Sequence, residues 1–224
     1  GLVLAQAIQP GLPFFMGGVL SVMDMSAMIL SYGAPELSLM MAGATELAHY
    51  AGIPLWQTGG CTDSKILDEQ AAIEGSLSCF FSALTGGDLC HDVGYTESGI
   101  TGSILQTVMM DEAIGYSRRI TRGIEVNQDT LATDIIHSVG PDGDYLNEEH
   151  TMKHSKTEFW YPNLCDRHNF EEWEEAGQKP MRDRVVERTK EILSSHKPSP
   201  IKPETEKAIK AIMEAAEKRV QDKP

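Results

Sequence analysis

Strand-like and helix-like segments alternate through the first 123 residues, and this alternation restricts the fold more than any other feature of the sequence. The strand-like segments are 12–20, 53–60 and 88–94. The helix-like segments are 34–52, 63–87 and about 102–122. Pro35 suits the first turn of a helix, and Gly52 suits the end of one. Strands that alternate with helices of this length predict βα units and a parallel sheet.

The composition changes after residue 140. Residues 1–123 are rich in Gly, Met and Ala, whereas the residues after 140 are rich in Glu, Lys, Arg and Pro. We predict a short amphipathic helix over 128–140 that stops at Gly140. Further helices are predicted at 169–177, 180–195 and 203–220. The sequence therefore predicts a core followed by a helical appendage.

The charge of the chain restricts its partners. A formal net charge of -14 argues against nucleic acid, because binding of phosphates needs clustered Lys and Arg. In residues 1–100 the only Lys or Arg is Lys65, whereas ten residues are Asp or Glu. A pocket built from this half should be negative and should favour a cation. The apolar runs are too short to cross a membrane, so we expect no membrane contact.

The four cysteines have no CxxC-like spacing, which argues against a zinc ribbon or a thioredoxin-type motif. They are Cys61, Cys79, Cys90 and Cys165. Free thiols in a reducing compartment are the simplest interpretation, and we expect a cytoplasmic location. The chain starts with Gly rather than Met, opens in a strand-like run and has no signal peptide. We therefore expect it to be a piece of a longer protein.

Three Gly-rich loops should meet at one edge of the predicted sheet. Parallel sheets bind ligands at the carboxyl ends of their strands, in open sheets and in barrels alike. The loops that follow the predicted strands are 17–33, 57–65 and 91–101. Residues 14–25 contain neither GxGxxG nor GxxxxGK[ST], so a loop that binds nucleotide phosphates is a poor interpretation.

In two of these loops, 57–65 and 91–101, the polar residues have more than one interpretation. Lys65 suits a Schiff-base nucleophile if desolvation lowers its pKa. The other interpretation is a helix start, with Thr62, Asp63 or Ser64 as the capping residue. In "CHDVGYTESG" at 90–99, His91 suits a base or ligand, Tyr95 a ring that binds a cation, and Glu97 a carboxylate partner. A histidine after a strand is also commonly structural.

A histidine pair stands in the second half of the chain. His150 and His154 are one helical turn apart, and Cys165 and His168 follow. The pair lacks the glutamate that HExxH requires directly after the first histidine. A zinc site is one interpretation. The other is aromatic and imidazole packing that docks a C-terminal extension.

Several segments resemble the trimethylamine methyltransferase superfamily of corrinoid-dependent enzymes, over about residues 1–195. They include "PGLPFFMGGVLSVMDM", "GGCTDSKILDEQAAIEG", "GGDLCHDVGYTESGIT", "VGPDGDYLNEEHTMKH" and "EFWYPNLCDRHNFEEWEEAG". The resemblance implies an α/β fold, the C-terminal part of a TIM-type (β/α)₈ barrel with a helical C-terminal extension. Residues 1–140 would form the C-terminal half of the barrel, and residues 141–224 would form the extension packed on it.

The resemblance also implies a reaction. Its enzymes transfer a methyl group from a methylated amine to the Co(I) corrinoid of a separate partner protein, so this chain itself should bind no cofactor. The founding members use pyrrolysine, whereas most relatives lack it and act on quaternary amines such as glycine betaine. No pyrrolysine is written here, which points to the second group. We expect an enzyme of this kind, with the fragment alone inactive.

The resemblance and the chemistry of a quaternary ammonium together suggest site residues. Such a cation is already an activated leaving group, so the protein mainly has to desolvate and align it. Aromatic faces and carboxylates suit this task. The predicted catalytic residues are His91 and Glu97, and no metal ligand is expected. The predicted substrate-binding residues are Phe14, Phe15, Tyr32, Trp56, Asp63, Lys65 and Tyr95, with Asp24 as a further negative neighbour.

A betaine also carries a carboxylate, which needs a cation or N–H donors. Lys65, His91, the Gly-rich loops and the absent N-terminal half all remain candidates for binding this carboxylate.

Two other classes of function stay open. One is a module that binds quaternary ammonium without turnover, and the other is a metal-dependent barrel enzyme that uses His91 or the His150 and His154 pair. Half of a barrel leaves open sheet edges, so we expect a homo-oligomer or contact with the missing part.

Overall fold

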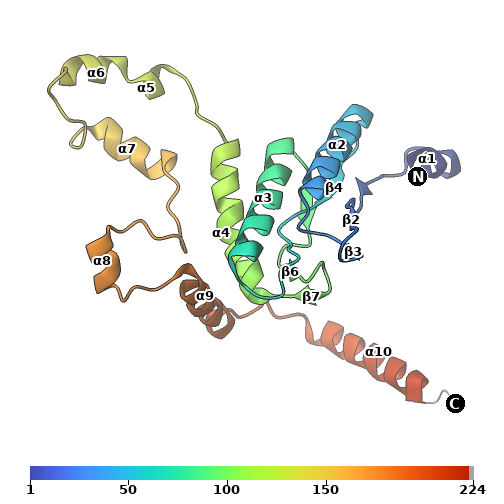
Figure 1. Ribbon diagram of the computed structural model, residues 1–224. Helices are drawn as coiled ribbons and strands as arrows, with labels where there is room; N and C mark the ends of the chain where they lie inside the picture. The colour runs from blue at the N-terminus through green and yellow to red at the C-terminus, as the bar shows by residue number, and fades with distance from the viewer. Residues whose placement is uncertain (222–224) are drawn as a thin grey trace. The chain divides into compact units, whose positions relative to one another are not determined.

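The computed structural model describes residues 1–221 (Figure 1). The chain forms two units, Gly1–Thr189 and a second that begins at Lys190. The helices are α1 (Leu2–Ile8), α2 (Pro35–Ala51), α3 (Glu69–Thr85), α4 (Ile104–Thr121), α5 (Gln128–Leu131), α6 (Thr133–Val139), α7 (Glu149–Glu158), α8 (Phe170–Glu175), α9 (Met181–Ser195) and α10 (Pro203–Gln221). The strands are β1 (Met16–Gly17), β2 (Met23–Asp24), β3 (Ile29–Leu30), β4 (Leu55–Thr58), β5 (Leu89–His91), β6 (Tyr95–Thr96) and β7 (Thr101–Gly102).

A small parallel sheet lies at the centre of the first unit. Its strand order is β1-β4-β5, and both neighbouring pairs are parallel. Helix α2 connects β1 to β4, α3 connects β4 to β5, and α4 follows β5. The predicted βα units and parallel sheet are therefore confirmed, and the fold is mixed α/β. The sheet is open, and no closed barrel is present within residues 1–221.

The helices cover one face of this sheet. Leu55 on β4 is fully buried and packs in one cluster with Leu37 and Ala48 of α2. Gln57 is two residues further along the strand, on the same face, and its amide donates a hydrogen bond to Thr45 of α2. Trp56 points to the opposite face and is 45% exposed. The second face therefore remains uncovered in the described chain.

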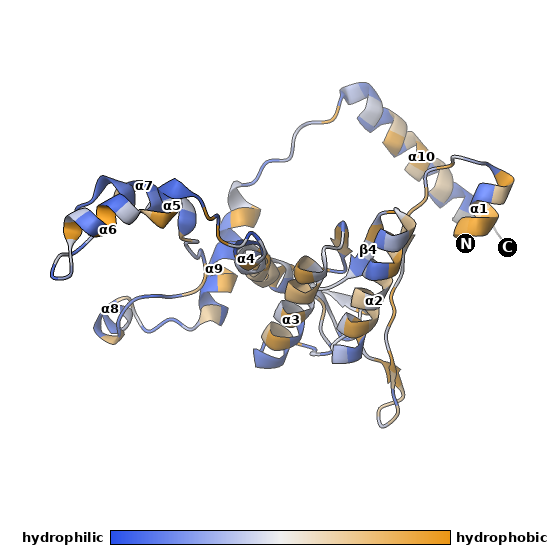
Figure 2. Ribbon diagram, turned by 90° about the horizontal axis from the view of Figure 1, so that it is seen from above, coloured by the Kyte–Doolittle hydropathy of each residue, from blue (hydrophilic) through white to orange (hydrophobic). Residues whose placement is uncertain are grey.

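Methionine and small residues fill the space between α3 and α4. Their shared core contains Ala71, Cys79, Met109 and Met110. Gly75 lets the helices approach closely, because a Cβ atom there would lie 2.6 Å from Sδ of Met110. Figure 2 shows hydrophobic and hydrophilic residues mixed along α2 and α3. Their exposed apolar side chains include Leu39, Leu47, Ile73 and Leu77.

Local capping explains the end of α2 and the start of α3. Helix α2 ends at Gly52 with a φ of 66°, as predicted, because glycine adopts this left-handed conformation without strain. Helix α3 begins later than expected. Its N-cap is Asp68, whose side chain accepts a hydrogen bond from the Ala71 N–H. The prediction that Thr62, Asp63 or Ser64 caps this helix is wrong, because these residues stay in the preceding loop.

The first 33 residues differ from the predicted pattern. The chain opens in helix α1 rather than a strand-like run, and the strand predicted over 12–20 contains only Met16–Gly17. Gly18 has a φ of 150°, which ends the extended conformation. The antiparallel pair of β2 and β3 follows and was not predicted. The short strand results from Gly and Pro residues on both sides of it.

The second half is largely helical, as predicted, with one break and with one helix, α7, in a segment expected to be irregular. The helix expected over 128–140 is divided into α5 and α6 at Ala132, which has a φ of 49°. Helices α8, α9 and α10 confirm the three helices predicted after residue 168. In the described residues, no helix combines the length and the hydrophobicity needed to cross a membrane. The predicted division at residue 140 stays a prediction.

Candidate functional site

The loops that follow β4 and β5 are joined by backbone hydrogen bonds. The Gly94 N–H donates to the Gly60 carbonyl at 3.0 Å, and the Thr62 N–H donates to the Tyr95 carbonyl at 3.0 Å. The Glu97 N–H donates to the Ser64 carbonyl at 2.9 Å. The predicted meeting of these loops at the carboxyl edge of the sheet is therefore confirmed.

Asp63 brings in the third loop. Its carboxylate accepts hydrogen bonds from the backbone N–H of Tyr32 at 2.8 Å and from the Ser98 hydroxyl at 2.8 Å. The Ser31 hydroxyl also donates to it. Ser31 and Tyr32 follow β3, whereas Ser98 lies in the loop after β5. One predicted substrate-binding carboxylate thus connects three loops and is already occupied by protein donors.

His91 is held on both sides of its ring. Its Nδ1 lies 2.8 Å from the Asp92 carboxylate, and its Nε2 lies 3.1 Å from the Thr58 hydroxyl. Since a carboxylate only accepts, Nδ1 donates to Asp92, and Nε2 pairs with the Thr58 hydroxyl. The ring packs against Trp56 with a centroid distance of 4.0 Å. This arrangement favours a positioning role over proton transfer.

Two tyrosines contribute aromatic surface to the same edge. The Tyr32 ring packs against Gly99, where a Cβ atom would lie 2.6 Å from it. Burial raises the pKa of the Tyr32 phenol, and the nearby Asp92, Cys61 and Tyr95 raise it further. Tyr32 therefore stays a neutral phenol near pH 7. Tyr95 is 40% exposed, so part of its ring faces solvent.

Glu97 and Lys65 have their own partners. Glu97 has a φ of 54°, and its carboxylate accepts a hydrogen bond from the Thr101 hydroxyl at 2.9 Å. The Lys65 ammonium donates to the Asp63 carbonyl at 2.8 Å and is exposed. Because a Schiff-base lysine needs desolvation to lower its pKa, this exposure does not favour that alternative.

Comparison with known proteins identifies the family. The family model described as "Trimethylamine methyltransferase (MTTB)" matches residues 1–221. The chain belongs to the trimethylamine methyltransferase family. The resemblance found in the sequence motifs is therefore confirmed.

Several relatives of this family member carry names that state an activity. It is 37% identical over 216 residues to "Trimethylamine methyltransferase MttB" of Desulfitobacterium hafniense (strain DSM 10664 / DCB-2), covering 96% of the chain and 43% of that relative. It is 33% identical over 222 residues to "Glycine betaine methyltransferase" of Desulfitobacterium hafniense (strain Y51), covering 98% and 46%. "Trimethylamine methyltransferase MttB" of Methanosarcina barkeri (strain Fusaro / DSM 804) is 31% identical, with 97% and 44% covered. The chain thus spans less than half the length of these relatives.

In this member of the trimethylamine methyltransferase family, three predicted residues lie apart from the loop junction. Phe14 and Phe15 precede β1, so they lie at the amino end of that strand. Asp24 accepts hydrogen bonds within its own turn, from the Ser26 hydroxyl at 2.6 Å and the Ala27 N–H at 2.8 Å. These bonds hold the pKa of Asp24 below its usual value. The described contacts give Asp24 the role of a turn residue.

Sequence reasoning missed Glu74, which supports the junction from α3. Its carboxylate accepts hydrogen bonds from the Thr62 hydroxyl at 2.5 Å and the Asp63 N–H at 2.9 Å. It also contacts Gly33, where a Cβ atom would lie 2.3 Å from the carboxylate. Its position in the second turn of the helix that follows a predicted ligand-binding loop was the available signal. Glu74 therefore holds the loop residues that in turn hold Tyr32.

The cysteines of this family member are free, as predicted, throughout the described residues. Burial raises the pKa of the Cys61 thiol, and it raises that of Cys79 to about 12. Both thiols are therefore protonated near neutral pH and act as small apolar side chains rather than as nucleophiles.

Proposed function

We propose that the longer protein to which this chain corresponds removes a methyl group from a quaternary or tertiary amine of the glycine-betaine type. The observation that carries the proposal is the loop junction at the carboxyl edge of the parallel sheet. The exposed ring of Trp56 packs against His91 at the end of β5, and Asp92, Tyr95 and Glu97 lie in the loop region that follows this strand. The family and the names of its relatives support an amine as substrate.

The chemistry of a methylated ammonium fits these residues. Its positive charge is spread over methyl groups, so it is attracted to aromatic faces and needs no specific hydrogen-bond acceptor. Indole and phenol rings provide such faces, and the neighbouring carboxylates add Coulombic attraction. The fixed ring of His91 supports Trp56 from one side. We propose that Trp56 and Tyr95 bind the cation, and that His91 and Glu97 keep the binding surface in place.

The methyl acceptor in this proposal is a corrinoid carried by a separate partner protein. Its Co(I) centre supplies the nucleophile, and residues of this chain bind and align the amine. Tyr95, in the loop at the carboxyl edge of the sheet, is 40% exposed, which supports an acceptor that approaches at that edge. We also propose a cytoplasmic location, in keeping with the free cysteines.

We further propose that the parallel sheet is part of a (β/α)₈ barrel in the longer protein. Neighbouring strands follow one another in sequence, and the connecting helices cover the same face. The opposite face exposes Trp56, and Leu89, its partner in register, is 55% exposed. In a barrel this face would form the interior. The isolated chain should therefore associate with another copy or with the missing part.

Residues after 141 include a segment that packs on this sheet-and-helix unit. The Glu112 carboxylate of α4 accepts hydrogen bonds from the backbone N–H groups of Leu164 at 2.9 Å and Cys165 at 2.8 Å. The Trp160 ring meets the Tyr116 ring edge to face, with centroids 5.5 Å apart. These contacts support a C-terminal extension that packs on the barrel.

A methyl-transfer assay tests the proposed function. The full-length protein is mixed with its corrinoid protein in the Co(I) state and with a panel of trimethylamine, glycine betaine and other quaternary amines. We expect the absorbance of Co(I) to be replaced by that of methyl-Co(III) with at least one amine. Binding of an amine without any methylation would favour the non-catalytic alternative, and neither binding nor methylation across the panel would contradict the proposal.

A further inference from the structure

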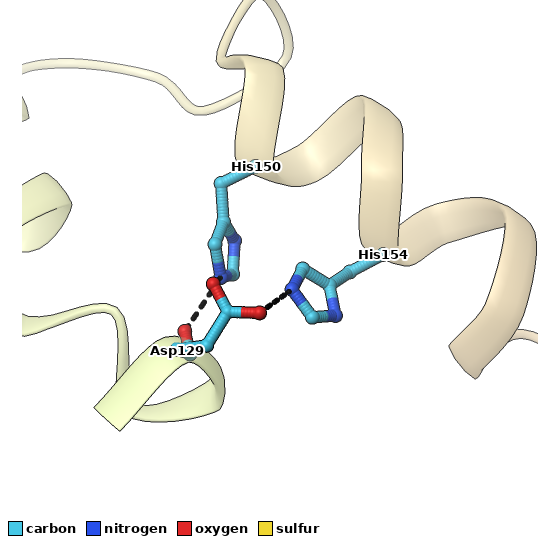
Figure 3. A group of neighbouring side chains, drawn as sticks. All are labelled: Asp129, His150 and His154. Atoms are coloured by element: carbon cyan, nitrogen blue, oxygen red, sulfur yellow. Dashed lines mark hydrogen bonds and ion pairs between the residues drawn. The ribbon is translucent and has the colours of Figure 1, made fainter. Parts of the chain in front are cut away.

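Three side chains from two helices meet outside the loop junction. His150 and His154 lie one turn apart on α7, and Asp129 lies on α5. Figure 3 shows both imidazole rings directed toward Asp129, with His154 bonded to its carboxylate and His150 to its backbone carbonyl. The two rings also lie against each other, with centroids 4.1 Å apart. Sequence reasoning identified the histidine pair but not the carboxylate, which is more than 20 positions away.

The distances between these groups suit ligands of one metal ion. Nε2 of His154 lies 3.2 Å from one carboxylate oxygen of Asp129, and Nε2 of His150 lies 3.9 Å from the other. One ligand atom from each residue can be chosen so that all three lie within 4.8 Å of one another. Ligands about 2.0–2.1 Å from a tetrahedral zinc ion lie about 3.3 Å apart. Small side-chain rotations would therefore bring the three donors around one ion.

The surroundings favour a cation. Between Arg122 and Lys153 the sequence contains seven Asp or Glu residues and no Lys or Arg. This acidic segment includes all of α5 and α6 and the start of α7. A divalent ion bound there would be attracted by the field of the segment as well as by its ligands.

The helices that carry the donors have no hydrophobic core of their own, although Arg119 and Arg122 of α4 bond to the C-terminal end of α7. In the described chain, α5, α6 and α7 contain no buried residue. The two imidazole side chains are nevertheless only 20% and 18% exposed. Segments without a hydrophobic core commonly depend on a metal ion or a partner for a fixed structure.

The cluster has internal partners that a metal ion would replace. Lys153 Nζ lies 2.7 Å from a carboxylate oxygen of Asp129, and His150 Nε2 donates to the Asp129 carbonyl at 2.7 Å. The Lys153 side chain is 62% exposed, so leaving the carboxylate for water costs little. Removing this lysine should therefore leave metal binding intact or strengthen it, whereas a plain salt-bridge network would be weakened.

We propose that Asp129, His150 and His154 bind a zinc ion that joins α5 to α7. Two imidazole nitrogens and one carboxylate oxygen are the ligands of a common zinc geometry, with water in the fourth position. Each neutral imidazole would bind the ion through Nε2 as the tautomer that carries its proton on Nδ1. The inference does not depend on methyl transfer, because none of these residues belongs to the loop junction.

Titration calorimetry of the untagged full chain with zinc tests the proposal. We expect one zinc per chain, and His150→Gln and His154→Gln each weaken binding by about 100-fold or more. His137→Gln on α6 is the matched control and should bind as the parent does. Lys153→Met should bind equally well or more tightly. Circular dichroism of each variant before zinc is added verifies that the helices are retained.

Cobalt(II) spectroscopy separates this site from the cysteines. Cobalt in the proposed site should give visible d–d bands without a thiolate charge-transfer band, and His154→Gln should remove them. A thiolate band, zinc binding that survives both histidine variants, or no binding at micromolar zinc would each overturn the proposal. Limited proteolysis between α6 and α7 adds a structural readout, since zinc should slow cleavage in the parent and in Lys153→Met.

Discussion

The imidazole ring of His91 packs against the indole ring of Trp56, with centroids 4.0 Å apart and ring planes inclined by 47°. The two residues lie on neighbouring parallel strands, and His91 is further held by Asp92 and Thr58. A large aromatic face is therefore held against the last residue of β5. This relationship leads to the first prediction.

Trp56→Leu in the full-length protein should weaken binding of a quaternary amine. Loss of a cation–π contact worth about 1 kcal/mol predicts a rise in KM of roughly fivefold or more, with a smaller change in kcat. Steady-state methyl transfer measures both constants. Trp173→Leu on α8 is the control, and an equal rise in KM for both variants would contradict a binding role for Trp56.

Asp63→Asn should destabilise the loop junction. The substitution replaces an acceptor of three hydrogen bonds by an amide whose NH₂ group faces donors, at a cost of roughly 1–3 kcal/mol in the free energy of unfolding. Urea unfolding followed by circular dichroism measures this loss. Asp24→Asn, in an exposed turn, should lose clearly less. If the two variants lose the same stability, Asp63 does not connect the loops as proposed.

Glu112→Gln should make stability less dependent on pH. Burial opposes ionisation of this carboxyl group, but the N–H groups of Cys165, Leu164 and Asn163 outweigh it and lower its pKa. A lowered folded pKa contributes stability that is present above the unfolded value of about 4.3 and is lost as the pH falls through the folded value. The parent should therefore exceed the variant by roughly 2 kcal/mol near pH 7.

The same comparison near pH 3 tests the sign of this effect. The difference between parent and Glu112→Gln should shrink there, because protons then bind the unfolded carboxyl group, which has the higher pKa, and so stabilise the unfolded state. Glu174→Gln, on the exposed helix α8, should show no comparable change between the two pH values. A difference that grows on acidification would contradict the hydrogen-bonded carboxylate.

Gly75→Ala should destabilise the chain although alanine is the better helix former. The added methyl group would lie 2.6 Å from Sδ of Met110 and 2.9 Å from Nε2 of Gln106, and both of those side chains are fully buried. Overpacking of this kind costs roughly 1–3 kcal/mol. At Gly43, in the middle of α2, a Cβ atom would meet no described atom within 4 Å.

Gly43→Ala is therefore the matched control for Gly75→Ala. It should stabilise the chain by up to about 1 kcal/mol through helix propensity alone. Denaturant unfolding of the two variants and the parent gives both values. A stabilising effect of similar size at both positions would mean that α3 and α4 are further apart than described.

Local signals in the sequence were sufficient to predict the alternation of strands and helices. The end of α2 at Gly52 and the order of strands and helices follow from hydrophobic pattern and capping, which act over a few residues. The start of α3 was missed because several residues before it can cap a helix. Thr62 and Asp63 instead bond to Glu74 and to the neighbouring loops, so tertiary contacts decided which residue became the cap.

The candidate site was also predictable from the sequence only in part. Its loops were found from the sequence, because the carboxyl ends of parallel strands must share an edge. The roles within the loops were not found. Asp63 was expected to face a substrate and instead connects loops, and Asp24 was expected nearby and instead closes its own turn. Side chains of one chemical type serve either purpose, and only their neighbours in space distinguish the two.

The sequence by itself determined the family, the alternation of strands and helices, and the charge of the first half. Only the tertiary structure decided that Asp129 meets His150 and His154, that Glu112 holds residues 163–165, and that Trp56 faces the uncovered side of the sheet. The physical reason is distance along the chain. Pattern and capping depend on residues within about one or two helical turns, whereas these contacts join residues that are tens of positions apart and depend on packing of the whole unit.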